Sequence, residues 1–166
     1  MSGSESGTLG ALINGDDVPA LEAKGYALNF QGKTREALED FLSVLRLAPD
    51  REWSLFGAAQ MAGQLGRSEE AVTFWLKAIT LNPWNWEYHD QLAKLYADRQ
   101  DWKNAAEQCQ EALKLNMAAL ETRTLLVKCL LRLRQTNAAQ REFETLLAFD
   151  PPDPETLRQW FAEENR

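Results

Sequence analysis

The side chains that most often carry catalysis or bind metals are few in this chain. His89 is the only histidine, so a Ser-His or Cys-His nucleophile would depend on it alone. The two cysteines, Cys109 and Cys129, form no CxxC pair, whereas a zinc site needs four ligands at short spacings. The sequence contains no glycine-rich phosphate loop, Walker sequence or serine elbow. We therefore expect a protein that is not an enzyme and that uses no metal or cofactor.

The remaining groups that could do chemistry are better explained by structure. Four carboxylates lie where helices are expected to begin or turn, at Glu69, Glu70, Asp98 and Asp101. Interaction with the helix dipole and with water explains charged groups at such positions. The cysteines read as small buried apolar residues. Function must then reside in a surface rather than in a reactive group.

Composition limits what such a surface can bind. The chain has 166 residues, of which 45% are hydrophobic and 26% charged, which is typical of one globular domain. Its net charge of −7 argues against a nucleic-acid or anionic-membrane partner. The first residues, MSGSESGTLGALINGDDV, resemble no secretory signal, and no run approaches the roughly 20 apolar residues of a membrane span. We expect a cytoplasmic protein.

The elements that position this surface follow from an internal repeat of 34 residues. Alanine recurs at that spacing, at Ala37, Ala71, Ala105 and Ala139. A proline follows twelve residues later, at Pro49, Pro83 and Pro151, with Met117 as the exception. A second column holds a large residue or cysteine, at Phe41, Trp75, Cys109 and Phe143. Such a period indicates one supersecondary unit repeated four times.

Each half of a repeat has the periodicity of an amphipathic helix. In the second unit we expect helices over residues 52–65 and 69–81, joined by a turn at Gly66, with Ser68 as the N-cap. Such a helix pair cannot bury both its apolar faces alone, so neighbouring units must stack. The four expected units are residues 18–51, 52–85, 86–119 and 120–153.

The segments GYALNFQGKTREALEDFLSVLRLAP and AAQMAGQLGRSEEAVTFWLKAITLNP resemble tetratricopeptide repeats, over about residues 18–153. The resemblance implies an all-α fold, a right-handed superhelical α-solenoid of helix-turn-helix repeats. Residues 154–166 then form a capping helix, and residues 1–17 a flexible N-terminal segment with some helix. The family's usual aromatic residue early in the first helix is replaced by Leu21, Leu55, His89 and Arg123. At that position His89 is expected to pack between helices.

The stretch LNPWNWEYH alternates aromatic and polar residues, as a half-buried strand does. The repeat instead places it at the joint between the second and third units, so we interpret it as a turn followed by the start of a helix. Trp86 and Tyr88 should pack against neighbouring helices, and Trp84 should be exposed.

In tetratricopeptide proteins, the first helices of successive repeats line a concave groove that holds a peptide or a partner's helix. The resemblance therefore implies a protein or peptide ligand. The groove positions carried over to this chain include Tyr26, Asn29, Phe30, Trp53, Phe56, Gln60, Asp90, Lys94, Lys128 and Arg132. The N-terminal half of this set is aromatic, with Gly57 and Gly63 expected to leave space beside it, and the C-terminal half is charged.

One family variant does not match. Tetratricopeptide domains that bind chaperone tails use a clamp of Lys, Asn and Arg, and the corresponding residues here are Glu22, Tyr26, Gly57, Glu87 and Gln91. Binding of a chaperone tail is therefore not predicted. We expect a non-enzymatic adaptor or scaffold that binds a peptide or helix of a partner in the groove and can be part of a larger protein.

Two further questions stay open at this level. The N-terminal part is also similar to type III translocator chaperones, which are small, acidic and built of three such repeats, so a dedicated secretion chaperone is the alternative function. The chain is expected to be a monomer or a weak homodimer. The apolar stretch Leu9 to Ile13 could supply a dimer contact or fold into the groove as an internal ligand.

Overall fold

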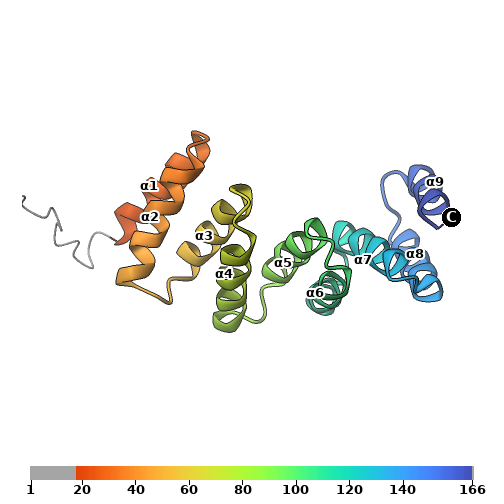
Figure 1. Cartoon of the computed structure of the whole chain (residues 1–166). Helices are drawn as coiled ribbons and strands as arrows, with labels where there is room; N and C mark the ends of the chain where they lie inside the picture. Colours follow the sequence, from red (N-terminus) through yellow and green to blue (C-terminus); the bar gives the residue numbers. More distant parts are fainter. Residues whose placement is uncertain (1–17, 166) are drawn as a thin grey trace, which may run out of the picture.

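The computed structural model describes residues 18–165, and within them the chain forms helices joined by short turns, with no strand (Figure 1). The helices are α1 (Val18–Phe30), α2 (Thr34–Leu47), α3 (Glu52–Gln64), α4 (Ser68–Leu81), α5 (Trp86–Asp98), α6 (Trp102–Leu115), α7 (Leu120–Arg132), α8 (Thr136–Ala148) and α9 (Pro154–Glu164). Each expected unit thus contains one helix pair, and α9 follows the fourth pair.

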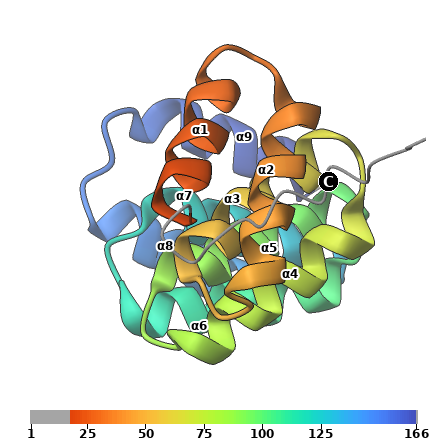
Figure 2. The same cartoon turned by 90° about the vertical axis from the view of Figure 1, so that its left-hand side faces the viewer.

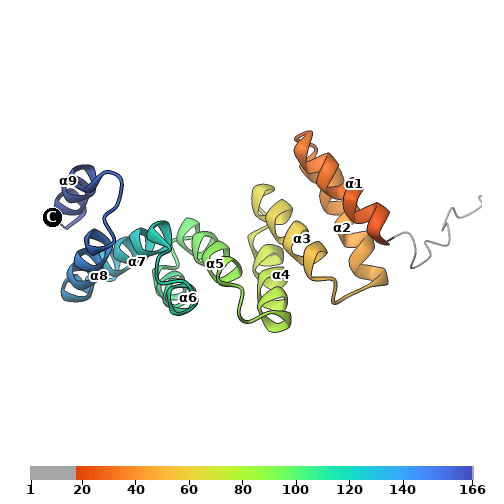
Figure 3. The same cartoon turned by 180° about the vertical axis from the view of Figure 1, so that it is seen from behind.

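The pairs stack side by side into the expected α-solenoid. Seen from either side, α1 and α2 lie at one end of the stack and α9 at the other (Figures 1 and 3). Viewed from the end that carries α1 and α2, the later helices follow one another behind them (Figure 2). Because each pair packs only on its neighbours, the surface along the first helices runs the length of the molecule.

The turn between the two helices of each pair has the same conformation in all four repeats. It requires one residue with positive φ, and residues 34 positions apart supply it: Gly32 (75°), Gly66 (73°), Gln100 (60°) and Arg134 (57°). In each turn the next N–H donates to a carbonyl five residues back, at 2.8–2.9 Å, as in a Schellman motif. Glycine adopts this conformation freely, whereas the last two repeats use side chains that resist it.

Helix starts use side-chain caps in three places. Asn85, Asp101 and Asp153 each accept a hydrogen bond from a backbone N–H in the first turn of the helix that follows. The expected cap at Ser68 is wrong. Helix α4 already begins at Ser68, and its N-cap residue, Arg67, makes no side-chain capping bond. The negative charges of Glu69 and Glu70, in the first turn of α4, instead interact favourably with the helix dipole.

The alanines that define the repeat lie where helices approach most closely, and all four are fully buried. The aromatic column packs beside them. A Cβ on Gly57 of the second repeat would lie 2.5 Å from the Phe41 ring of the first repeat, and one on Gly25 would lie 3.0 Å from it. The expectation that Gly57 leaves space in the groove is therefore wrong, because the Phe41 ring fills that space. Gly63 does have open space around its Cα.

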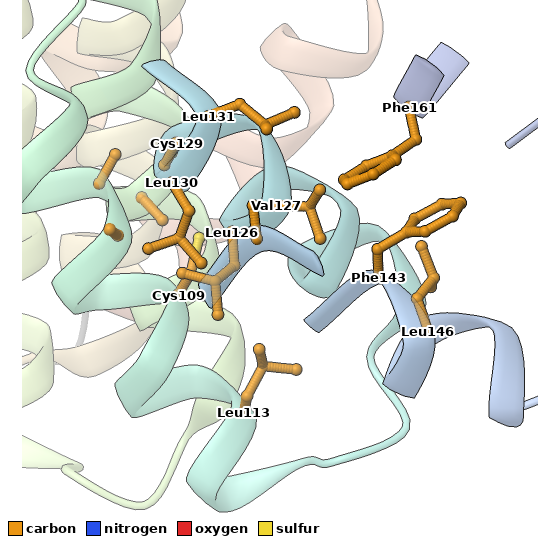
Figure 4. Close-up of a cluster of buried hydrophobic side chains, with 14 of the residues drawn as sticks. Cys109, Leu113, Leu126, Val127, Cys129, Leu130, Leu131, Phe143, Leu146 and Phe161 are labelled. Carbon is orange, nitrogen blue, oxygen red and sulfur yellow. The ribbon is translucent and has the colours of Figure 1, made fainter. Parts of the chain in front are cut away.

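Three apolar clusters follow one another along the stack, and the last includes the capping helix. Figure 4 shows this third cluster, in which Phe143 of α8 and Phe161 of α9 face each other. Their rings are stacked, with centroids 4.2 Å apart. Helix α9 thus covers the apolar end of the fourth repeat, as the sequence predicts. Within residues 18–165, no helix is long and apolar enough to cross a membrane.

Candidate partner-binding surface

The N-terminal half of the predicted groove contains an exposed aromatic patch on α3. Trp53 is 62% exposed, and the half-buried Phe56 meets it edge-on with centroids 6.5 Å apart. Phe56 in turn packs edge-on against the buried Trp75, at 5.4 Å, and lies 6.1 Å from the Tyr88 ring. This packing holds the patch rigid, so an apolar side chain could bind it with little loss of conformational entropy.

Tyr26 fixes the position of this patch rather than extending it. Its ring is half-buried and meets Phe41 edge-on at 4.9 Å. Its hydroxyl donates a 2.7 Å hydrogen bond to the backbone oxygen of Trp53. Burial, followed by the nearby Glu22 carboxylate, raises the pKa of Tyr26 to about 12, so the hydroxyl keeps its proton and remains a donor at neutral pH.

A hollow of about 210 Å³ lies beside the patch, between α3 and α5. Its lining includes Gln60, Gln64 and Gln91, whose amides can each donate and accept hydrogen bonds. Lys94 and Asp98 also line the hollow and carry one charge of each sign. Gly63 lines it as well and has no side chain to fill it. Amide groups of this kind suit the alternating N–H and C=O groups of a peptide backbone.

The C-terminal half of the predicted groove is basic. A second hollow, of about 410 Å³, is lined by Lys128, Arg132, Asp98 and Trp102 among others. Arg132 pairs with Glu164 of the capping helix, with 2.8 Å between Nη2 and Oε2. Lys128 makes no ion pair with any other residue in the range 18–165, although its side chain lies in the hollow wall. This ammonium group is therefore available to a ligand carboxylate.

Asp90 and Lys94 are less available than their sequence positions indicate. Asp90 is only 4% exposed, and its Oδ1 accepts a 2.7 Å hydrogen bond from the Thr122 hydroxyl of the next repeat. Its Oδ2 lies 2.8 Å from Nζ of Lys94, which also lies 3.8 Å from a Glu121 oxygen. Asp90 therefore joins repeats, while Lys94 still lines the hollow between α3 and α5.

The joint between the first two repeats is built in the same way. Glu22 Oε1 accepts a 2.7 Å hydrogen bond from the Ser54 hydroxyl, and Arg51 Nη2 lies 2.8 Å from Glu22 Oε2. At the joint between the second and third repeats, Phe56 occupies the position equivalent to Glu22, and Tyr88 the position equivalent to Ser54. Sequence reasoning missed these hydroxyls, although Ser54 and Thr122 occupy the same column of their repeats.

The two other predicted groove residues lie on α1. Asn29 is half-buried near the end of the helix, whereas Phe30, its last residue, is 95% exposed. Neither of them lines the two hollows described above. The predicted set therefore separates into a patch with an adjacent hollow around α3 and α5, a basic hollow near α7, and the isolated end of α1.

The groups that could do chemistry pack as structural residues. His89 is 9% exposed, and its Nδ1 lies 2.8 Å from Gln108 Oε1 of α6. Cys109 and Cys129 are both buried in the third cluster (Figure 4), and hydrogen bonding between them, with burial, raises the pKa of Cys109. No cluster within residues 18–165 has the three His, Cys, Asp or Glu ligands that could hold a metal.

The aromatic stretch at the middle joint follows the sequence interpretation. Trp84 lies in the turn before α5 and is 79% exposed, whereas Tyr88 is buried within the first turn of α5. The Tyr88 hydroxyl donates a 2.5 Å hydrogen bond to Glu52 of the preceding repeat. Trp86 is half-buried and packs on the third cluster. No strand forms here.

This arrangement of stacked helix pairs is that of a helical repeat protein, a class whose members generally present interaction surfaces without catalysis. Family profiles of the tetratricopeptide repeat match residues 18–51 and 54–83, and a second profile of the same repeat matches residues 96–157. The chain belongs to the tetratricopeptide repeat family.

Comparisons with individual proteins agree with this assignment. The chain is 29% identical over 138 residues to the BBSome complex member BBS4 of Xenopus tropicalis, and the match spans 83% of this chain but only 27% of that relative. Among solved structures, MamA superposes with a TM-score of 0.78 at 15% identity, covering 91% of this chain and 89% of MamA. YrrB, described as a tetratricopeptide protein with an unusual peptide-binding site, gives 0.74 at 20% identity over 92% and 81% of the two chains.

Proposed function

We propose that this protein is a non-enzymatic adaptor that binds one extended segment of a partner protein along α3, α5 and α7. The observation that carries the proposal is the exposure of Trp53. Trp53 is 62% exposed on a helix that buries Leu55 and Met61, and its ring meets the half-buried Phe56, so the two rings form an exposed apolar patch that a ligand side chain could cover.

The chemistry of the ligand follows from the order of groups along the surface. An apolar side chain binds Trp53 and Phe56, and the ligand backbone meets the amides of Gln60 and Gln91 in the hollow between α3 and α5. An acidic side chain further along binds Lys128, a hollow-lining cation that makes no ion pair with any residue from 18 to 165. YrrB, a tetratricopeptide protein with a peptide-binding site, is consistent with this use of the fold.

The alternative function, a dedicated secretion chaperone, gains no particular support. The translocator chaperones that the N-terminal part resembles have three repeats, whereas this chain has a fourth pair, α7 and α8, and a closing helix α9. The basic hollow lies between the third pair and α7, which supplies Lys128 and Arg132 to its lining. We therefore keep the adaptor as the proposed function.

A selection from a displayed library of random peptides tests the proposal without a known partner. We expect the enriched peptides to combine an aromatic or aliphatic residue with Asp or Glu at a constant spacing. Lys128→Glu should remove the preference for acidic residues and keep the apolar one, because it reverses a single charge at one end of the site. Ligands without this pairing, or ligands that bind Lys128→Glu equally well, would contradict the proposal.

A further inference from the structure

Two residues that break the repeat pattern lie together on the side of α7 away from the groove. Met117 stands where the other repeats have proline, and Arg123 where they have leucine or histidine. Arg123 Nη2 donates a 3.0 Å hydrogen bond to the backbone oxygen of Met117. Arg132 of the basic hollow follows Arg123 by nine residues, about two and a half helical turns, so the two side chains leave α7 on opposite sides.

A hollow of about 460 Å³ lies beside these two residues, between α6 and α8. Both are second helices of their repeats, and α7 lies between them (Figures 1 and 3). The apolar part of the lining consists of Leu113 of α6, Met117 in the turn after it and Leu126 of α7. The two leucines are buried, whereas Met117 is 68% exposed. We call this site the outer hollow.

The polar part of the outer hollow is richer in cations than in anions. Arg123, whose side chain is only 8% exposed, pairs through Nη1 with Glu142 of α8. Lys114 also lines the hollow, and its exposed pair with Glu111, at 2.6 Å, is of a kind that contributes little to stability. The lining thus holds two cations and one carboxylate that is already paired. An incoming negative charge is therefore complementary to it.

The pairing of Arg123 with Glu142 does not by itself explain a buried guanidinium. One repeat earlier the same two columns hold His89 and Gln108, which meet at 2.8 Å and join their helices with an amide and an imidazole. Arg123 Nε, by contrast, has no acceptor among residues 18–165. A buried donor without an acceptor is unfavourable, and a ligand carboxylate drawn to the guanidinium would supply the missing oxygen.

We infer that the outer hollow binds a second partner protein, through a segment in which a large apolar side chain stands next to Asp or Glu. The apolar side chain packs on Leu113, Met117 and Leu126, and the carboxylate pairs with Lys114 and Arg123. Because the hollow and the groove lie on opposite sides of α7, both segments can bind at once. The protein then joins two partners directly, which goes beyond holding one segment in the groove.

A peptide selection on a chain with an altered groove isolates ligands of the outer hollow. The bait is the full chain with Trp53→Ser/Lys128→Glu, which changes both ends of the groove site proposed above. We expect the enriched peptides to contain Leu, Met or Phe next to Asp or Glu. A selection that enriches nothing, or only peptides without this pairing, would overturn the inference and leave the proposal for the groove untouched.

Methyl resonances of ¹³C-labelled methionine then locate the bound peptide. Met117 reports on the outer hollow, and the fully buried Met61 of the second repeat is the internal control. We expect a selected peptide to shift the Met117 signal only. Lys114→Glu should weaken binding at least about tenfold because it reverses a charge in the lining, whereas Lys103→Glu, at an exposed position of the same helix, should not. An unmoved Met117 signal, or equal effects of the two substitutions, would contradict the site.

The same resonance detects other occupants of the outer hollow. A shift of the Met117 signal when residues 2–17 are removed would show that this segment of the chain covers the hollow. A shift on dilution of the chain without peptide would show that a second copy covers it. Either result overturns the inference, and we expect neither.

Discussion

The pKa values of the three tyrosine hydroxyls reflect the burial of the tyrosine side chains. Burial is the largest cause that raises the pKa of Tyr26, Tyr88 and Tyr96, and nearby carboxylates add to it in each case. These are all the tyrosines of the chain. Because a tyrosine loses a proton to become charged, a raised pKa means that folding favours the neutral form.

We therefore predict that the folded protein forms less tyrosinate than the unfolded chain at about pH 10, where an unperturbed tyrosine is half ionised. The stabilisation linked to Tyr26 should be fully present below about pH 10 and be lost as the pH rises toward about 12. Ultraviolet titration of tyrosinate in native and denaturant-unfolded protein measures this difference. Half-ionisation near pH 10 in the native protein would show that the tyrosine packing described here is incorrect.

Two glycines of one helix should respond to alanine in opposite directions. At Gly57 the added methyl group would lie 2.5 Å from the Phe41 ring, so we expect Gly57→Ala to destabilise the fold by about 1–3 kcal/mol. At Gly63 nothing lies within 4 Å, so Gly63→Ala should stabilise it by up to about 1 kcal/mol through helix propensity. Urea denaturation of the two variants gives both values, and equal signs would contradict the packing around Phe41.

At the scale of the elements, the helix pairs share one turn geometry but not one turn residue. Gln100 and Arg134 adopt the positive φ that Gly32 and Gly66 adopt without strain. We predict that Gln100→Gly stabilises the protein by about 0.5–1 kcal/mol, the relief of left-handed strain less the extra chain entropy of glycine. The reciprocal change Gly66→Gln, whose Cβ meets no neighbouring atom within 4 Å, should destabilise it by a similar amount in thermal unfolding. A Gln100→Gly variant that loses stability would contradict this account of the turn.

Most of the architecture at this scale can be predicted from the sequence. The 34-residue register places the helix pairs, the capping helix and the helical start at Trp86, because it is repeated four times and each copy constrains the others. The burial of Asp90 could not be predicted in the same way. It depends on a hydroxyl 32 residues away on the next repeat, and a charged residue on a first helix is usually solvated.

For the whole molecule, the joints between repeats decide whether the stack behaves as one body. Asp90→Ala should cost about 1–3 kcal/mol because it leaves the buried Thr122 hydroxyl without its acceptor. Asp98→Ala is the matched control, since this exposed carboxylate makes no ion pair with any residue from 18 to 165, and it should change stability by less than about 0.5 kcal/mol. Hydrogen exchange should locate the loss in α7 and α8. Equal effects of the two substitutions would contradict a joint at Asp90.

The groove surface is the part of the molecule that sequence reasoning resolved least. The family resemblance indicated which helix faces to consider, and it predicted an aromatic half and a charged half. It could not distinguish side chains that are free to bind, such as Trp53 and Lys128, from those occupied within the protein, such as Tyr26 and Asp90. That distinction depends on contacts between repeats, which a column pattern does not contain.

The most direct test of the account is the affinity of one selected peptide for two tryptophan variants, measured by isothermal titration calorimetry. Trp53→Ser removes the proposed anchor, and Trp84→Ser removes a more exposed tryptophan in the turn before α5. We predict that Trp53→Ser weakens binding at least about thirtyfold, as loss of a hot-spot residue worth about 2 kcal/mol does, and that Trp84→Ser leaves it unchanged. Equal affinities of both variants and the wild type would contradict a ligand site at Trp53.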